Sequence, residues 1–562
     1  MIFHEIRVIV VSKKVNIFLI KIALKKIMKN SFTIILLLIS NLLLSQQLDP
    51  TFANQGVLKS EVKNMSPYTK VVIKNNFITS DKSILNIGNY ASTNYSNETT
   101  DLSLTFIKKY NNLGVLDTSY GNNGTFMVPN YRNIISGFGA DDNYLFSSIN
   151  TPDNSVILSL VNNRGRRWFM KVTDLGQYDT KFGNEGFLDY PLSLATNSPP
   201  YLIKLNDYFI TIAHRNNKFY LHSYNYDGTP NINFGNNGLI ISDYGDEYTD
   251  LIHLKVLYKN NKIYIYGSTN YQNIVYNFIS CYNENGYIDT SFGINGFFLL
   301  ERLNKANEDI YINEYTDFDI QDDGKILFIA NSTKEGVYIP FAFRYKKNGS
   351  LDQNFGKEGN IIFSNPDSWY SMHASKIIQL PNKKILIGGY IIGSPDISGN
   401  GPSILCLNEN GSIDSEFGGN MKSLTNSRNV QGVYLLPGDY SSIKQINLDN
   451  EENSIIISAT TERKLWSYIY KLKYNMDMLF TIDNEVNNDK FNIFPNPIEQ
   501  IATFSNNLNK KDIEYVVLDL NGRVIKKGNV KDKTIDFSKI KRGTYIIKLK
   551  DLEYKSIKVI KK

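Results

Sequence analysis

The side chains with the clearest chemical potential in this chain are acidic residues that recur along most of its length. Successive repeats place Asp, or once Asn, at Asp49, Asp117, Asp179, Asn231, Asp289, Asp352 and Asp414, with spacings of 68, 62, 52, 58, 63 and 62 residues. Each carboxylate could bind Ca²⁺, or it could accept backbone N–H hydrogen bonds from the turn that follows it. We favour the turn, because Ca²⁺ usually takes several oxygen ligands from one loop and only one carboxylate recurs per repeat.

Other reactive side chains are scarce. The chain has 2 Cys and 5 His, and the His residues fall at different phases of the repeats. Trp369, Tyr370 and His373 could together line a ligand face, but core packing is the explanation that we favour. The motifs of phosphate-binding loops, nucleophile elbows and zinc proteases are missing from the sequence. We therefore expect no cofactor, no metal and no assigned catalytic residue.

The two cysteines occupy equivalent places in the fourth and sixth repeats. Cys281 and Cys406 each lie five residues before a repeated glycine, Gly286 and Gly411. A whole repeat separates them, whereas a disulfide needs Cα atoms within about 7 Å. The spacing therefore predicts two free thiols.

The repeated acid belongs to a longer motif. An apolar or aromatic residue usually precedes it, an aromatic residue follows three positions later, and a glycine follows seven positions later in every copy except the one at Asp414. The apolar positions can fill a gap between neighbouring units, and the glycines allow a positive φ. We assign structural roles to Asp49, Phe52, Gly56, Asp117, Tyr120, Gly124, Asp179, Phe182, Gly186, Phe234, Gly238, Asp289, Phe292, Gly296, Asp352, Phe355, Gly359, Asp414 and Phe417.

The segments between the motifs are typical of β-strands. Apolar and aromatic runs such as Ile263–Tyr266 and Phe278–Tyr282 alternate with turn pairs such as Asn348-Gly349, and no segment has a helical period. Three or four strands in each of seven repeats predict a seven-bladed β-propeller over residues 47–482. We expect residues 47–58 to supply the strand that closes the ring, because a worn eighth copy of the motif, Asp477 with Phe480, ends the series.

The motif and its spacing of about 60 residues resemble the delta-60 repeat family of β-propellers. The match covers residues 47–482. It implies a fold and no particular activity, because propellers host many functions.

The N-terminal segment has the plan of a secretory signal peptide. A basic start at Met28-Lys29 leads into the apolar core Phe32–Leu44, which is too short to span a bilayer. We assign residues 28–46 to a signal peptide and residues 1–27 to an upstream extension. The alternative is a longer, two-part membrane anchor.

The last part of the chain is predicted to be a separate domain. The polar linker 483–490 precedes residues 491–562, whose short alternating strands suggest a small Ig-like antiparallel β-sandwich. This segment resembles the type A sorting domain of the type IX secretion system of Bacteroidetes, which implies that the secretion machinery is a partner. An Ig-like accessory domain is the alternative. The residues that carry the resemblance are Pro495, Asn496, Pro497, Asp519, Gly522, Gly543 and Tyr545.

The distribution of charge along the chain further restricts the classes of binding partner. Residues 491–562 carry 16 basic and 8 acidic side chains, whereas residues 46–490 have a net charge of −8. A nucleic-acid-binding surface is therefore not expected on the main body. The combined predictions are an all-β, secreted or cell-surface protein that acts as a binding or adhesion scaffold for an unknown extracellular ligand, a glycan or a protein. A secreted hydrolase, acting on glycans from one propeller face, is the first alternative, and a structural surface-layer component is the second.

Overall fold

The computed structural model describes 38 β-strands and no helix among the residues that it covers. These are residues 46–61, 70–91, 103–129, 143–162, 165–190, 200–215, 217–245, 247–272, 274–300, 312–334, 337–363, 370–393, 401–415, 417–422, 429–438, 441–461, 466–474, 493–494, 498–504, 514–519, 523–530, 534–549 and 556–562. The expected extension 1–27, most of the expected signal peptide and the expected linker 483–490 lie outside them. Within the described residues, no helix is long and apolar enough to cross a membrane.

The chain divides into two compact units, Met1–Phe480 and Thr481–Lys562. The described part of the first unit contains seven antiparallel sheets of four or five strands, numbered here in chain order.

Sheets one to four each contain four consecutive strands. They are β3 (Lys70–Ile78), β4 (Ile84–Ala91), β5 (Ser103–Tyr110) and β6 (Thr125–Met127); β7 (Asn143–Asn150), β8 (Val156–Asn162), β9 (Arg167–Val172) and β10 (Phe187–Asp189); β11 (Tyr201–Lys204), β12 (Tyr208–Arg215), β13 (Lys218–Asn225) and β14 (Leu239–Asp243); and β15 (Tyr248–Lys259), β16 (Lys262–Tyr271), β17 (Ile274–Asn283) and β18 (Phe297–Leu299).

Sheets five to seven follow the same plan with additions. They are β19 (Ile312–Ile320), β20 (Ile326–Lys334), β21 (Val337–Tyr345) and β22 (Asn360–Ile362); β23 (Tyr370–Gln379), β24 (Ile385–Gly393), β25 (Gly401–Leu407) and β28 (Val433–Leu435); and β29 (Ser441–Asp449), β30 (Ser454–Thr461) and β31 (Trp466–Tyr474) with β1 (Gln46–Leu48) and β2 (Val57–Glu61). A separate two-stranded sheet joins β26 (Gly418–Lys422) to β27 (Asn429–Gln431).

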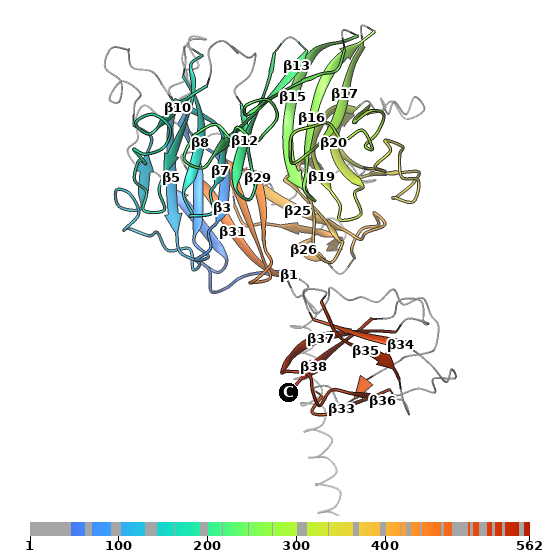
Figure 1. Ribbon diagram of the computed structural model, residues 1–562. Helices are drawn as coiled ribbons and strands as arrows, with labels where there is room; N and C mark the ends of the chain where they lie inside the picture. The colour runs from blue at the N-terminus through green and yellow to red at the C-terminus, as the bar shows by residue number, and fades with distance from the viewer. Residues whose placement is uncertain are drawn as a thin grey trace, which may run out of the picture. The chain divides into compact units, whose positions relative to one another are not determined.

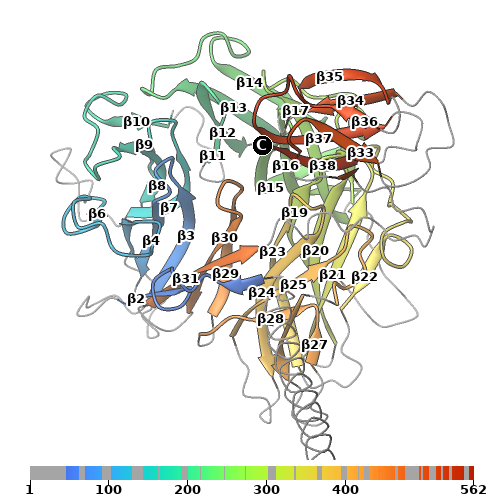
Figure 2. The same ribbon diagram turned by 90° about the horizontal axis from the view of Figure 1, so that it is seen from below.

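The first strands of the seven sheets form a closed ring. Each of β3, β7, β11, β15, β19, β23 and β29 contacts the first strand of the next sheet, and β29 returns to β3. Figure 1 shows the sheets side by side, and Figure 2 shows them arranged around a common centre. The first unit is therefore a β-propeller, as the sequence predicts.

Buried ionic contacts join some of these first strands. In β19, the Asp319 carboxylate accepts a hydrogen bond of 2.9 Å from Lys259 of β15 and one of 2.7 Å from the backbone N–H of Gln379 in β23. Asp317 contacts Lys255 and accepts a 3.0 Å hydrogen bond from the Ile377 N–H in the same way. Three neighbouring sheets are thus connected close to the ring.

The ring is closed by the two ends of the unit. Strand β1 pairs antiparallel with β31 from Leu48 opposite Leu472, and β2 pairs with the same strand from Val57 opposite Tyr470. The expectation that residues 47–58 pair with the last sheet is confirmed. The degenerate eighth copy of the motif, around Asp477, lies outside the described residues.

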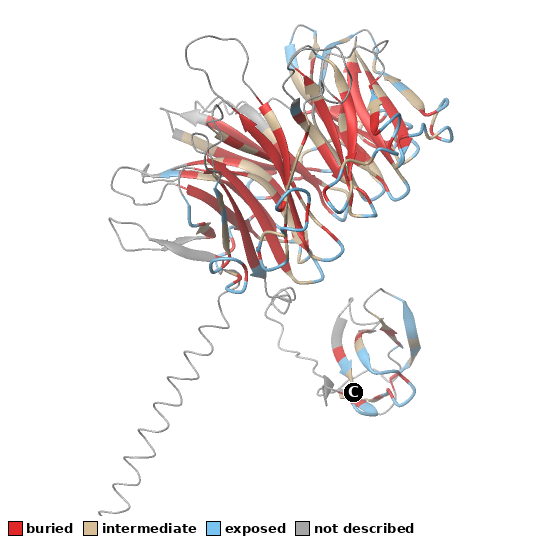
Figure 3. Ribbon diagram, turned by 90° about the vertical axis from the view of Figure 1, so that its left-hand side faces the viewer, coloured by how far each residue is buried: buried red, intermediate tan, exposed pale blue. Residues whose placement is uncertain are grey.

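The core lies between the sheets. Strands β4 and β30 are buried along their whole length, and Figure 3 shows the same burial along the middle strands of the other sheets. Sheets covered on both faces carry continuous apolar runs instead of alternating ones. The run Ile455-Ile456-Ile457 in β30, where no side chain is more than 2% exposed, is an example.

The second unit has its own core. A sheet of β35 (Val524–Asn529), β34 (Glu514–Leu518), β37 (Gly543–Leu549) and β38 (Ser556–Lys561) accompanies a sheet of β32 (Ile493–Phe494), β33 (Ile501–Phe504) and β36 (Thr534–Asp536). Val517, Ile535, Ile547 and Val559 lie in one buried cluster that draws on both sheets. The Ig-like topology stays a prediction.

Deleting residues 47–58 is expected to lower the melting temperature of the propeller by about 10 °C or more. The deletion exposes the edge of β31 and removes Phe52, which is completely buried. Calorimetry of the purified variant measures the loss, with Leu175→Ala, at a side chain that is 59% exposed, as a near-neutral control. An unchanged transition would show that the ring does not depend on this closure.

Candidate functional site

The repeated aspartates cap the turns that follow them. Asp49 Oδ1 accepts hydrogen bonds from the Thr51 backbone N–H at 3.0 Å and from the Thr51 hydroxyl at 2.6 Å. Ser119 donates both hydrogen bonds to Asp117, and Ser291 donates both to Asp289. The turn contacts predicted from the sequence are therefore present.

The backbone of the motif is anchored to the third strand of its sheet. The Asp117 N–H donates to the Lys109 carbonyl, eight residues earlier, at 2.9 Å. The copy at Asp49 directly follows β1, and its N–H donates to the Lys471 carbonyl of β31 at 2.7 Å. The first copy of the motif thus serves the last sheet.

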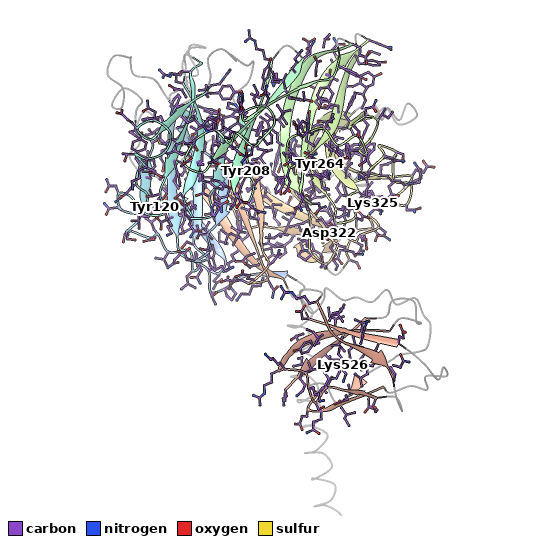
Figure 4. The ribbon with its side chains drawn as sticks, viewed as in Figure 1. Tyr120, Tyr208, Tyr264, Asp322, Lys325 and Lys526 are labelled. Carbon is purple, nitrogen blue, oxygen red and sulfur yellow. The ribbon has the colours of Figure 1, made fainter. Side chains whose placement is uncertain are left out.

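The motif aromatics lie against the next repeat. Phe52, Tyr120, Phe182, Phe234, Phe292, Phe355 and Phe417 are all at most 2% exposed, and Tyr120 is labelled in Figure 4. A Cβ added at Gly114 would lie 2.9 Å from the Phe52 ring, so this glycine leaves room for the ring of the preceding motif. Backbone N–H groups of the motif also donate to carbonyl oxygens of the next repeat: Ala53 donates to Leu113, and Gly121 donates to Leu175.

Each motif carboxylate in the described residues has a cation beside it. In three sheets the cation lies eight residues before the acid: Lys109 is 3.8 Å from Asp117, Lys171 is 3.7 Å from Asp179, and Arg344 is 2.9 Å from Asp352. For Asp49, Lys473 of β31 approaches to 3.1 Å. Lys325, labelled in Figure 4, adds a second cation 3.8 Å from Asp352.

The two cysteines replace this cation in sheets four and six. Cys281 and Cys406 are eight residues before Asp289 and Asp414, and in both sheets a lysine at the start of the second strand or directly before it supplies the charge instead. Lys262 is 3.1 Å from Asp289, and Lys384 is 2.7 Å from Asp414. Both cysteines are buried and free, as predicted, and burial raises the pKa of Cys281 to about 12.

Sheet three changes both partners together. Here the acid is Asn231 and the residue eight before it is Ser223, which accepts a 3.1 Å hydrogen bond from the Asn231 amide. A hollow of ≈ 300 Å³ lies beside them and is lined by Asp207, among others. Asn231 and Ser223 thus form a neutral pair, whereas in the other sheets the motif acid lies beside a cation.

These contacts favour the ionised form of Asp49 and Asp117. Burial opposes ionisation of Asp49, but hydrogen bonds from Thr51 and the charge of Lys473 outweigh it and lower its pKa. The Ser119 hydroxyl lowers the pKa of Asp117. A lowered folded-state pKa stabilises the fold above pH ~4, and this stability is lost as the pH falls through the lower value. Among the described residues, no cluster of three or more acidic, His or Cys side chains could hold a metal.

A different feature has the geometry of a ligand site. A groove of ≈ 1070 Å³ runs along β14 and β18, the last strands of sheets three and four. We call it the tyrosine groove. Its lining residues are Ile240, Ile241, Ser242, Asp243, Tyr244, Glu247, Tyr248, Tyr271, Tyr282, Gly286, Tyr287, Ile288, Thr290, Ile294, Asn295, Phe297, Phe298, Leu299, Asn348, Gly349 and Ser350.

Aromatic rings form both ends of the tyrosine groove. Tyr248 and Tyr271 are paired across β15 and β16 and stack with ring centroids 5.1 Å apart, and Tyr248 meets Phe297 edge to face at 5.2 Å. Tyr287, which is 57% exposed, follows the opposite end of β17. Ile241 and Ile294 are 50% and 74% exposed in the same groove.

A buried hydroxyl network supports the groove from beneath. Tyr282 of sheet four donates to Ser242 of sheet three at 2.9 Å and also shares a short hydrogen bond with Tyr244. Burial raises the pKa of Tyr282 to about 12, so the hydroxyl stays neutral. The two sheets are thereby held together below the exposed rings.

The ligand face considered around Trp369 lies elsewhere. Trp369 is outside the described residues, and His373 is packed between Tyr338 and Tyr390, with ring centroids 5.1 Å away from each. The tyrosine groove was not anticipated from the sequence; it accompanies the long strands of sheet four, whose β15 has 12 residues and whose β16 and β17 have 10 each.

The sorting-domain residues that the structure describes are positioned by strands. Asp519 accepts a 2.9 Å hydrogen bond from the Arg523 N–H and closes the turn between β34 and β35. Gly543 begins β37, and Tyr545 of that strand is buried, with its hydroxyl donating to the Lys541 carbonyl at 2.9 Å. Residues 495–497 and Gly522 lie outside the described residues.

Two family models match parts of the chain. Residues 492–562 match the secretion system C-terminal sorting domain. Residues 259–292, 321–355 and 380–417 match a β-propeller domain of unknown function (DUF5122). The chain is thus a β-propeller protein with a type IX sorting domain, and it is exported to the cell surface or the extracellular space.

No curated protein matches the chain in sequence. Among solved structures, it is similar to the extracellular domains 1–2 of Drosophila Semaphorin 1a, with 8% identity over 73% of this chain and 88% of that chain, at a TM-score of 0.38. The β-propeller domain of the Trilobed protease from Pyrococcus furiosus has 8% identity over 75% and 99% of the two chains, at a TM-score of 0.36. The polysaccharide lyase Uly1 has 12% identity over 74% and 91%, at a TM-score of 0.39.

The substitution Asn231→Asp is expected to destabilise the propeller by about 1–3 kcal/mol, because sheet three has Ser223 where a cation would be needed. Adding Ser223→Lys should recover most of this loss. Urea unfolding of the two single variants and the double variant gives the coupling energy. Additive effects, or a fully stable Asn231→Asp variant, would contradict the requirement for a cation beside each motif acid.

Proposed function

We propose that this exported β-propeller protein is a non-catalytic binding or adhesion scaffold, with the tyrosine groove as its ligand site. The observation that carries the proposal is the set of rings along one large groove, the half-buried pair Tyr248 and Tyr271 together with the exposed Tyr287. Ligand sites are typically concave, rich in aromatic side chains and furnished with a few polar groups. The motif aspartates, by contrast, use their carboxylates in hydrogen bonds to their own turns and in ion pairs.

The titration behaviour of the acids supports binding over hydrolysis. Glycoside hydrolysis needs a carboxylic acid whose pKa is raised, so that it carries a proton near neutral pH. Among the described residues, every carboxyl group with a shifted pKa is shifted downward, as for Asp153, at about 2. Within the groove, the hydrogen bond with Lys218 lowers the pKa of Asp243.

The proposal is tested on the purified exported protein with an array of glycans and extracellular proteins and with a panel of chromogenic glycoside and peptide substrates. A scaffold should retain at least one ligand on the array and release no chromophore above buffer. Turnover of a glycoside would support the hydrolase alternative instead.

Removing residues 491–562 is expected to leave the propeller folded but retained in the periplasm. The reason is that the second unit has its own core and matches the sorting domain. Cell fractionation with limited proteolysis measures both properties. A signal-bearing reporter fused to residues 491–562 is the matched gain-of-function control. Normal surface delivery of the truncated protein would contradict a sorting role for this unit.

A further inference from the structure

We infer that the tyrosine groove binds a neutral saccharide chain, which lies along β14 and β18 and stacks on tyrosines at both ends. This inference rests on the proposed function and names the ligand of the same site. It follows from the aromatic faces, the charge and the length of the groove.

The aromatic faces provide the stacking surface. Tyr248 and Tyr271 form a stacked pair braced by Phe297, so their rings are held in place without a ligand. The aliphatic C–H face of a pyranose ring packs well against such a surface, while the phenol hydroxyls can meet its hydroxyl groups. Rings that are already ordered lose little entropy on binding.

The charge of the groove selects against acidic ligands. None of its lining residues is Lys, Arg or His, and the two charged ones, Asp243 and Glu247, are acidic. Asp243 is neutralised by Lys218 at 2.6 Å. A uronate, sulfate or phosphate group would find no cation among the lining residues, and Glu247 would repel it.

The remaining polar groups suit hydroxyl groups. The groove contains neutral donors and acceptors on Ser242, Thr290, Asn295, Asn348 and Ser350. Hydroxyls and amides can donate and accept at once, which matches the hydroxyl pattern of a sugar. A neutral saccharide therefore fits both the rings and the polar edge.

The length of the groove favours a chain over a single sugar. The ring of Tyr248 reaches Phe297, which pairs with Ser280 in β17, and Tyr287 is hydrogen-bonded to Asn283 at the end of the same strand. Three residues separate Ser280 from Asn283, so the two aromatic ends are separated by about 10 Å of strand at ~3.3 Å per residue. A single sugar unit is too short to stack on both ends, so affinity should rise with chain length.

The test uses the full exported chain and isothermal titration with neutral hexasaccharides of glucose, xylose and mannose. Hexagalacturonate and an uncharged hexapeptide are the comparison ligands. At least one neutral hexasaccharide should bind, and its monosaccharide should bind about tenfold or more weakly. Tyr248→Ala and Tyr287→Ala should each weaken binding by about tenfold, a factor equivalent to 1.4 kcal/mol.

Two controls separate stacking from folding. Tyr248→Phe keeps the ring and should retain most of the affinity, whereas Tyr144→Ala removes an exposed tyrosine of β7 outside the groove and should have no effect. Thermal melting should be the same for all variants.

The outcomes are distinguishable. Preference for the galacturonate or the peptide, or saccharide binding that survives both alanine variants, overturns the inference and leaves a binding scaffold in place. Hydrolysis of the saccharides during titration would instead overturn the proposed function.

Discussion

The propeller depends on one repeated interaction, the aspartate that caps a turn while a cation lies beside it. The same turn presents an aromatic ring to the next sheet, so the capped turn sets both the end of one sheet and its contact with its neighbour. A buried carboxylate without a partner would cost several kcal/mol. The cation comes from different positions in sequence: Lys109 from the third strand of its sheet and Lys262 from the second strand of another, and each lies beside its motif acid. Sheet three is consistent with the same pairing requirement, because neutral residues replace both the acid and the cation there.

The motif carboxylates and the tyrosine groove have different roles. The carboxylates accept hydrogen bonds from their own turns and lie beside cations, so they are used within the fold. In the tyrosine groove, the buried hydroxyls of Tyr282 and Ser242 hold two sheets together beneath rings that stay partly open to solvent. The ligand surface therefore rests on a rigid support, which keeps the cost of ordering it on binding small.

Most of the fold could be predicted from the sequence because the same motif recurs in each repeat. The motif aspartates and aromatics marked the units, and the isolated copy at Asp49 correctly indicated where the ring closes. The cations were missed because they have no constant sequence distance from the acid. The groove was missed because Tyr248, Tyr271 and Tyr287 come from positions that only strand pairing brings to one site. Trp369 and His373 attracted attention as neighbours in sequence, yet His373 is packed between two other rings.

The pairing of β1 and β2 with β31 has a consequence for the order in which this chain matures. Val57 and Tyr470 are neighbours in the sheet but lie more than 400 positions apart in sequence, and such distant contacts form slowly. The ribosome makes β2 early and β31 more than 400 residues later, so a nascent chain carries unpaired strands until β31 has been synthesised through Tyr474. Unpaired edges are prone to join other chains. A chain interrupted before that point leaves β1 and β2 without their partner strand, so its ring stays open.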